Sequence, residues 1–352
     1  MSTPTVRQVL TQLQAEGVRL PPYDPQRVFR VQPPASSPWY VRLFAGFGAW
    51  TAAILLVAFL FVARIVESEG VALVLGLMLC AGMLALSRTR SSSDFVQQLG
   101  LSLSLVGQVL FTFGVAALSN ETSVAALAVI MLQLILLAGY ADQFHRFLSG
   151  LWIVGALLAI LANYSQFNLI HLVIVGLAGL ITVVVVYELE LLVSRWWEIL
   201  HPVGYAATVA LLGLLLLPLQ TELAIHWWGF TAVALLALLG VVIWRIATEL
   251  ALPLSRLQLA TMVVLGVGLT ILSVKMPGVA AALLVLVLGY WRSNHILLGL
   301  AGAFLLFYMG AYYYSLELTL LNKSLLLIGT GGLLLTLRAV LLRARQESRG
   351  IQ

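Results

Sequence analysis

Long apolar runs separated by short polar or charged stretches make up most of the sequence. Many of these runs approach the roughly 20 residues that a helix needs to cross a bilayer. The pattern therefore predicts an all-α, polytopic transmembrane helical bundle of about twelve helices. The predicted helices cover residues 43–63, 71–86, 95–118, 124–141, 147–162, 169–187, 203–219, 230–244, 259–274, 279–291, 295–314 and 324–342.

Several of the runs are short, because charges or prolines bound them after only 13 to 17 residues. Such a helix must include flanking residues or pack as the tilted partner of a longer one. The run 279–291 is the weakest of the twelve by this criterion.

The polar stretches divide the chain into five parts. Residues 1–38 form a tail with a short amphipathic helix and a proline-rich linker, and residues 346–352 form a second tail. Residues 39–187 and 201–345 each contain six predicted helices. Between them, residues 188–200 mix charges with leucine and tryptophan, which is typical of an amphipathic link lying in the membrane interface.

The basic residues predict the orientation, since loops rich in lysine and arginine stay in the cytoplasm. With twelve helices and a cytoplasmic N-terminus, sixteen of the 19 lysines and arginines fall on the cytoplasmic side. Only Arg64, Lys275 and Lys323 fall outside. We therefore expect both termini in the cytoplasm.

Composition excludes an ordinary soluble protein, because 61% of the residues are hydrophobic and only 9% are charged. The lipid bilayer is thus the first expected partner. The net charge of +5 reflects the orientation of the helices in the membrane and does not indicate nucleic-acid binding. The single cysteine, Cys80, excludes an internal disulfide. The five histidines lack metal-ligand spacing. No catalytic or phosphate-binding motif is found, so we expect no enzyme activity, cofactor or metal.

Polar residues inside the predicted helices are few, and all fourteen carboxylates fall in the tail, in loops or at helix ends. Gln108 and Gln133 lie near the middle of consecutive antiparallel helices. They are expected either to hydrogen-bond between helices or to line a path for a neutral solute. His171, near the outer end of its helix, is expected to be a satisfied interfacial histidine rather than a ligand.

The C-terminal hairpin, residues 295–345, gathers the most specific loop chemistry. Gly299, Ala303 and Gly310 share one face of its first helix, which suits close helix packing. The outer tip is a candidate docking surface for a partner, and its alternative role is a simple tyrosine anchor in the headgroup layer. The tip residues are Tyr312, Tyr313, Tyr314, Glu317, Asn322 and Lys323.

The same hairpin carries a resemblance. The segment 312–324, YYYSLELTLLNKS, followed by a glycine-containing apolar helix and Arg338, resembles the C-terminal signature of an uncharacterised bacterial inner-membrane family of unknown function. Members are often encoded beside proteins named for a GDYXXLXY motif, so the resemblance implies such a protein as a candidate partner. The major facilitator superfamily also has twelve helices, but its charged glycine-rich loop after the second helix is absent here.

Two functions from different classes remain open on the sequence. The leading interpretation is a non-enzymatic scaffold or subunit of a membrane complex, since small-residue faces are present and central charges are not. The alternative is a transporter or channel for a neutral or amphipathic substrate. A polar crevice reaching Gln108 or Gln133 would favour transport.

Overall fold

The computed structural model describes residues 39–87, 94–140, 142–192, 194, 196–217, 225–249, 273, 276–315 and 328. In this part of the chain every regular element is helical and no strand occurs. The helices are α3 (Trp39–Val62), α4 (Glu69–Ser87), α5 (Asp94–Ser119), α6 (Thr122–Gly139), α7 (Gln143–Asn163), η1 (Phe167–Leu169), α8 (Ile170–Val186), α9 (Glu188–Leu192), α10 (Trp197–Leu214), α11 (Trp228–Glu249), α13 (Pro277–Trp291) and α14 (His295–Ser315).

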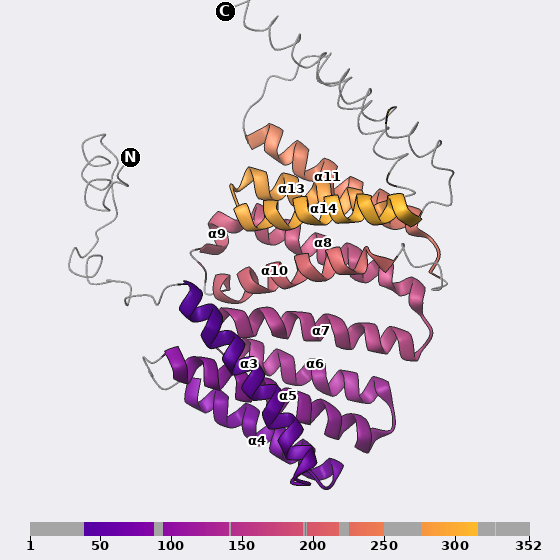
Figure 1. Ribbon diagram of the computed structural model, residues 1–352. Helices are drawn as coiled ribbons and strands as arrows, with labels where there is room; N and C mark the ends of the chain where they lie inside the picture. Colours follow the sequence, from indigo (N-terminus) through magenta and orange to yellow (C-terminus); the bar gives the residue numbers. More distant parts are fainter. Residues whose placement is uncertain are drawn as a thin grey trace, which may run out of the picture.

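The helices lie side by side in a stack (Figure 1). Along it, α5 packs on α6, α6 on α7, α7 on α10, α10 on α8, α8 on α11, α11 on α13 and α13 on α14. Helix α3 crosses obliquely over α5 at one end of the stack. Short connections between consecutive helices make most neighbours antiparallel, as the alternating apolar runs predict.

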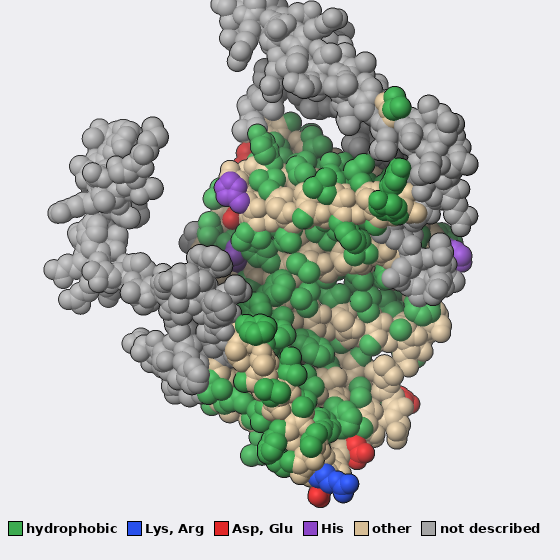
Figure 2. Space-filling model, in the orientation of Figure 1, with side chains coloured by type: hydrophobic (Ala, Val, Ile, Leu, Met, Phe, Trp, Pro, Cys, Tyr) green, Lys and Arg blue, Asp and Glu red, His purple; other side chains and the backbone are tan. Residues whose placement is uncertain are grey.

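The predicted helical membrane bundle is confirmed for the described residues. Six helices are long and apolar enough to span a bilayer, and three shorter apolar segments accompany them at 50–62, 69–85 and 277–291. Figure 2 shows a face of hydrophobic and other uncharged side chains, with charges and histidines at its margins. The predicted helices 259–274 and 324–342 lie outside the described residues apart from Ser273 and Ile328, as do both tails.

Helices α4 and α5 approach each other closely. A Cβ atom placed on Gly76 would lie 2.5 Å from the backbone nitrogen of Phe111 and 2.7 Å from the carbonyl oxygen of Gly107. One on Gly114 would lie 2.6 Å from the backbone nitrogen of Leu73. Glycine is therefore required at this contact, where the two backbones themselves touch.

The glycine face predicted on the C-terminal hairpin is open in this part of the chain. A Cβ atom on Gly299 or Gly310 meets no atom of the described residues within 4 Å. The helix expected to cover that face, 324–342, lies outside the described residues, so this packing prediction stays a prediction.

Buried apolar side chains form one large core and smaller ones beside it. The large core joins α8, α10, α11, α13 and α14, while a second core is built from α4, α5, α6 and α7. Helix α8, the last of the predicted first half, thus packs with helices of the second half. The contact of α7 with α10 connects the two groups.

A proline and an arginine fix the contact between α7 and α10. Pro202 lies inside α10 and has no N–H to donate to the carbonyl of Glu198, four residues earlier. The buried Arg146 of α7 donates its Nη1–H to that carbonyl oxygen at 2.7 Å. The same nitrogen lies 3.6 Å from a carboxylate oxygen of Glu198. Arg146 thereby supplies the hydrogen bond that the proline cannot.

Candidate functional site

Small and polar residues recur at helical spacing on one face each of α5, α6 and α7. On α5 they repeat every fourth residue, which places them along one stripe. The members on α7 lie four or three residues apart, and so do those on α6 except for the adjacent Ala125 and Ala126. The members are Ser104, Gln108, Thr112 and Ala116 on α5 with Asn120 just after its end, Thr122, Ala125, Ala126 and Gln133 on α6, and His145, Ser149, Ala156 and Ala159 on α7, together with the larger apolar Val129 of α6 and Trp152 of α7.

At one end of these stripes, four side chains from three helices form a hydrogen-bond network, here called the amide network. Gln133 of α6 donates from Nε2 to Oε1 of Gln108 at 2.9 Å. Nε2 of Gln108 lies 3.3 Å from the hydroxyl of Ser104 and 3.1 Å from Nε2 of His145. The Ser104 hydroxyl is also 3.0 Å from Nε2 of His145. All four residues are at most 1% exposed.

The far side of the His145 ring is held by α7 and by the α6–α7 turn. Its Nδ1 lies 3.4 Å from the hydroxyl of Ser149, and the ring of Tyr140 stacks on it with 4.3 Å between centroids. Asp142 caps α7 by accepting a hydrogen bond from the backbone nitrogen of His145 at 2.8 Å. Burial and the nearby Asp142 carboxylate raise the pKa of Tyr140 to about 12, so its hydroxyl stays protonated at neutral pH.

On the other side of the amide network the three stripes separate into an open groove with a volume of about 650 Å³, here called the α5–α7 groove. Its base is formed by Thr112, Val129 and Trp152, one helical turn from Gln108, Gln133 and Ser149 respectively. Asn120 and Thr122 lie at the opposite end. Alanine and glycine line most of its length, so side chains leave this space open.

The chemistry of the site is neutral. The lining of the groove and the amide network contain no aspartate, glutamate, lysine or arginine. Amides and hydroxyls both donate and accept hydrogen bonds, so they suit a neutral polar solute. Oε1 of Gln133 is buried and has no hydrogen-bond partner among the described residues. A buried acceptor left unpaired is costly, and an incoming donor would satisfy it.

The structure brings Gln108 and Gln133 together and places His171 elsewhere. His171 is buried between α8 and α11, with Nδ1 2.6 Å from the hydroxyl of Thr231 and Nε2 bonded to the carbonyl of His226. The indole of Trp228 meets its ring edge-on at 4.9 Å. Both ring nitrogens are thus engaged in joining two helices.

The predicted docking tip is described only in part. Tyr312, Tyr313 and Tyr314 end α14, where the rings of Tyr313 and Tyr314 meet edge-on at 5.5 Å and Tyr314 is 82% exposed. Glu317, Asn322 and Lys323 lie outside the described residues.

Ser104, His145 and Ser149 were not predicted as site residues. The twelve-helix topology predicts His145 on the inner side of the membrane, just before the predicted helix 147–162. The signal that could have found it is the four-residue spacing of Ser104 from Gln108 and of His145 from Ser149, which places polar groups on matching faces.

The comparison with protein families decides the family of the chain. The model of a domain of unknown function, DUF4401, matches residues 38–344. The chain belongs to this family. The DUF4401 match covers every helix of the stack, including α5, α6 and α7 and therefore the whole amide network. Neither the curated proteins nor the solved structures contain a match to this DUF4401 chain.

Proposed function

We propose that this integral membrane protein binds a small neutral or amphipathic solute in the α5–α7 groove and passes it along the three stripes. The observation that carries the proposal is the alignment of the groove with the amide network. Thr112 links the two, since it lines the base of the groove one helical turn from Gln108 and its hydroxyl donates to the backbone carbonyl oxygen of Gln108 at 2.7 Å.

The amide network is the barrier in this arrangement. Gln108 and Gln133 close the groove by bonding to each other at 2.9 Å. A solute carrying a hydroxyl or an amide can replace either partner of that bond without leaving a buried group unpaired. An ion finds no opposite charge among these residues, and so the passage favours neutral molecules. Catalysis plays no part in this function.

Filling the groove tests the proposal. We expect Ala159→Phe, on the groove side of α7, to lower erythritol uptake into proteoliposomes at least about fivefold, because the ring occupies the open space. Erythritol is a neutral polyol that crosses pure lipid slowly. Ala162→Phe is the matched control, since Ala162 is exposed on the same helix and does not line the groove.

Uptake equal to that of protein-free liposomes by folded wild-type protein would contradict transport of this solute class. Uptake that is equal in both alanine variants would place the path elsewhere in the bundle.

The second candidate function is that of a subunit or scaffold of a membrane complex, which the end of α14 supports. Three consecutive tyrosines end this helix, and tyrosine makes large, rigid contacts at interfaces. The proposed partner is an extracytoplasmic segment of a membrane-associated protein of the GDYXXLXY type. It would use Glu317 and Lys323 to fix its orientation.

Copurification tests this docking. We expect the combined change Tyr313→Ala, Glu317→Ala and Lys323→Ala to reduce recovery of a coexpressed GDYXXLXY protein at least about tenfold at equal amounts of folded protein. Equal recovery with the wild-type protein would reduce the tip to a tyrosine anchor.

We also propose twelve crossings, with both termini in the cytoplasm of a bacterial cell and the protein in its inner membrane. The support is the sixteen-to-three distribution of basic residues. An impermeant thiol reagent added to intact cells should label cysteines introduced at Asn120 and Asn322 and spare those at Ser2 and Gln352. Labelling at Ser2 or Gln352 would overturn the orientation.

A further inference from the structure

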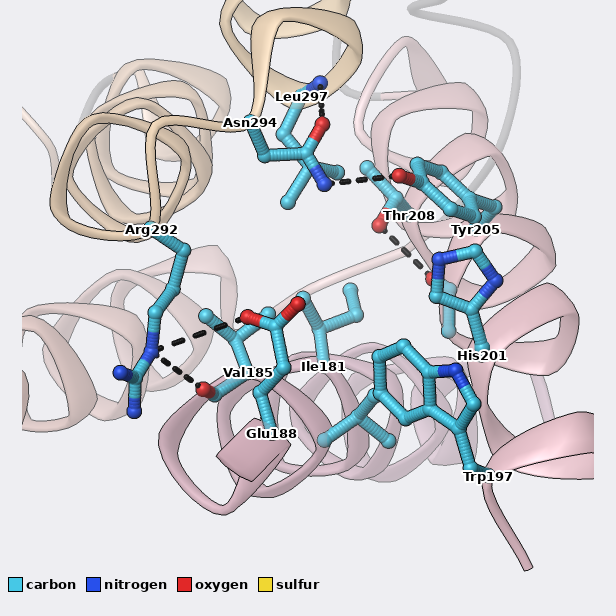
Figure 3. A pocket seen from close by; sticks show the side chains of 12 residues that line it. Ile181, Val185, Glu188, Trp197, His201, Tyr205, Thr208, Arg292, Asn294 and Leu297 are labelled. Carbon is cyan, nitrogen blue, oxygen red and sulfur yellow. Dashed lines mark hydrogen bonds and ion pairs between the residues drawn. The ribbon is translucent and has the colours of Figure 1, made fainter. Parts of the chain in front are cut away.

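A second polar site lies at the ends of α8, α10, α13 and α14, away from the amide network. It is a partly open pocket that Glu188, the first residue of the short helix α9, enters just after the C-terminal end of α8 (Figure 3). Trp197, His201 and Tyr205 border it from one face of α10, and Arg292 and Asn294 border it from the α13–α14 turn.

The arginine in this pocket is occupied by the backbone of α8. Arg292 donates from Nε to the carbonyl of Val185 at 3.0 Å and from Nη2 to the carbonyl of Val186 at 2.7 Å. These carbonyls lie in the last turn of α8, where no N–H four residues further along the helix is available to them. The carbonyl of Val185 also accepts a hydrogen bond from the backbone N–H of Tyr187, which follows the helix. The guanidinium also suits the negative end of the helix dipole. Arg292 therefore mainly caps the C-terminal end of α8.

The carboxylate of Glu188 is consequently left with one weak partner. Its Oε2 lies 3.8 Å from Nε of Arg292, which is beyond hydrogen-bond length. Among the described residues no hydrogen bond to this carboxylate is found. Figure 3 shows it in the middle of the pocket, between Arg292 and the aromatic side chains of α10.

The aromatic side chains form a column beside the carboxylate. The ring centroid of His201 is 4.6 Å from that of Trp197 and 5.0 Å from that of Tyr205. The Tyr205 hydroxyl is fixed by a 2.7 Å hydrogen bond from Nδ2 of Asn294. A carboxylate next to tryptophan and tyrosine faces is the chemistry that binds an ammonium group.

The carboxylate determines which ammonium group the pocket favours. A primary ammonium has three N–H donors, which the oxygens of Glu188 can accept. A trimethylammonium has no N–H to donate. The pocket thus favours an ethanolamine head over a choline head.

An apolar groove continues from the pocket along α7, α10 and α14. It has a volume of about 490 Å³ and shares His201 and Tyr205 with the pocket. Phe144, Val209 and Ile296 line it and are exposed, as expected of side chains that face lipid. An acyl chain fits this groove while its head reaches Glu188.

We propose that the Glu188 pocket and the adjoining groove form a binding site for one phospholipid with an ethanolamine head. The pocket lies at the level where charged residues and Trp197 end the helices, which is the depth of lipid headgroups. This site shares no residue with the α5–α7 groove, so the proposed lipid binding does not depend on the proposed transport.

Native mass spectrometry of the purified full chain, titrated with dioleoyl phosphatidylethanolamine or dioleoyl phosphatidylcholine, tests the proposal. Both lipids are zwitterionic and have the same chains. We expect the first lipid to bind about tenfold more tightly to the wild-type protein. Glu188→Gln should abolish this preference, and Trp197→Leu should weaken it while leaving the pair of Glu188 and Arg292 intact.

Glu190→Gln is the matched control, because Glu190 is exposed on the same short helix α9 and does not line the pocket. It should keep the preference of the wild-type protein. Equal affinity of the wild-type protein for the two lipids would overturn the proposal. So would a preference that survives in folded Glu188→Gln protein.

Discussion

Gly76→Ala is expected to lower the free energy of unfolding by about 1–3 kcal/mol, which is the cost of overpacking a tight contact. The added methyl group would lie 2.5 Å from a backbone nitrogen of α5, and backbone cannot rotate away as a side chain can. The two helices must therefore move apart. Gly76→Leu should prevent the pairing of α4 with α5. Unfolding of the purified protein in detergent, followed by circular dichroism, measures both effects.

Gly82→Ala on the same helix provides the control. A Cβ atom at Gly82 meets no atom of the described residues within 4 Å. Replacing an exposed helical glycine by alanine favours folding by about 0.5–1 kcal/mol, because glycine loses more backbone entropy. The two substitutions should thus change stability in opposite directions. A Gly76→Ala protein as stable as Gly82→Ala would show that α4 and α5 are not in backbone contact.

Gln108→Leu is expected to destabilise the protein by about 1–3 kcal/mol, since it leaves buried polar groups without a partner. Gln108 contacts Ser104, Gln133 and His145. Its loss disconnects Gln133 of α6 from the network, while the hydrogen bond between Ser104 and His145 still joins α5 to α7. Thermal unfolding in detergent measures the loss, and erythritol uptake measures the effect on the passage. The proposed function predicts that uptake changes even at temperatures where the variant is fully folded.

Gln133→Leu separates stability from transport at the same site. Gln133 makes one hydrogen bond, and its Oε1 is already unpaired among the described residues. Its replacement should therefore destabilise the protein less than Gln108→Leu, by about 0.6–2 kcal/mol. If both variants lose stability but transport erythritol like the wild-type protein, the amides serve only to hold helices together.

Hydrophobic periodicity was sufficient to predict the helical membrane bundle, because the bilayer imposes both the length and the apolar character of each spanning helix. It also led to Gln108 and Gln133, since a polar residue in the middle of an apolar run is conspicuous. Their mutual contact followed from the antiparallel order of two neighbouring helices.

The remainder of the site depends on tertiary packing that the sequence does not display. His145 looks like a rim residue until α7 is placed against α5. From the sequence, Arg146 is one of the basic residues that indicate the cytoplasmic side. In the structure it is buried and donates to the carbonyl of Glu198, 52 positions further along the chain, which Pro202 leaves without its helical donor. Helix α8 likewise belongs to the core of the later helices, because packing follows surface shape rather than order in the chain.

The close contact of α4 and α5 also encloses the chain's single cysteine. Cys80 is 2% exposed, and its Sγ lies 3.7 Å from the carbonyl oxygen of Ser104, one turn of α5 before Gln108. The native thiol is therefore a reporter placed beside the proposed passage. Its rate of alkylation by a small permeant reagent measures how often α4 separates from α5, without any label being added. While the helices stay together, the thiol is shielded, and cysteines introduced elsewhere can be labelled without replacing it.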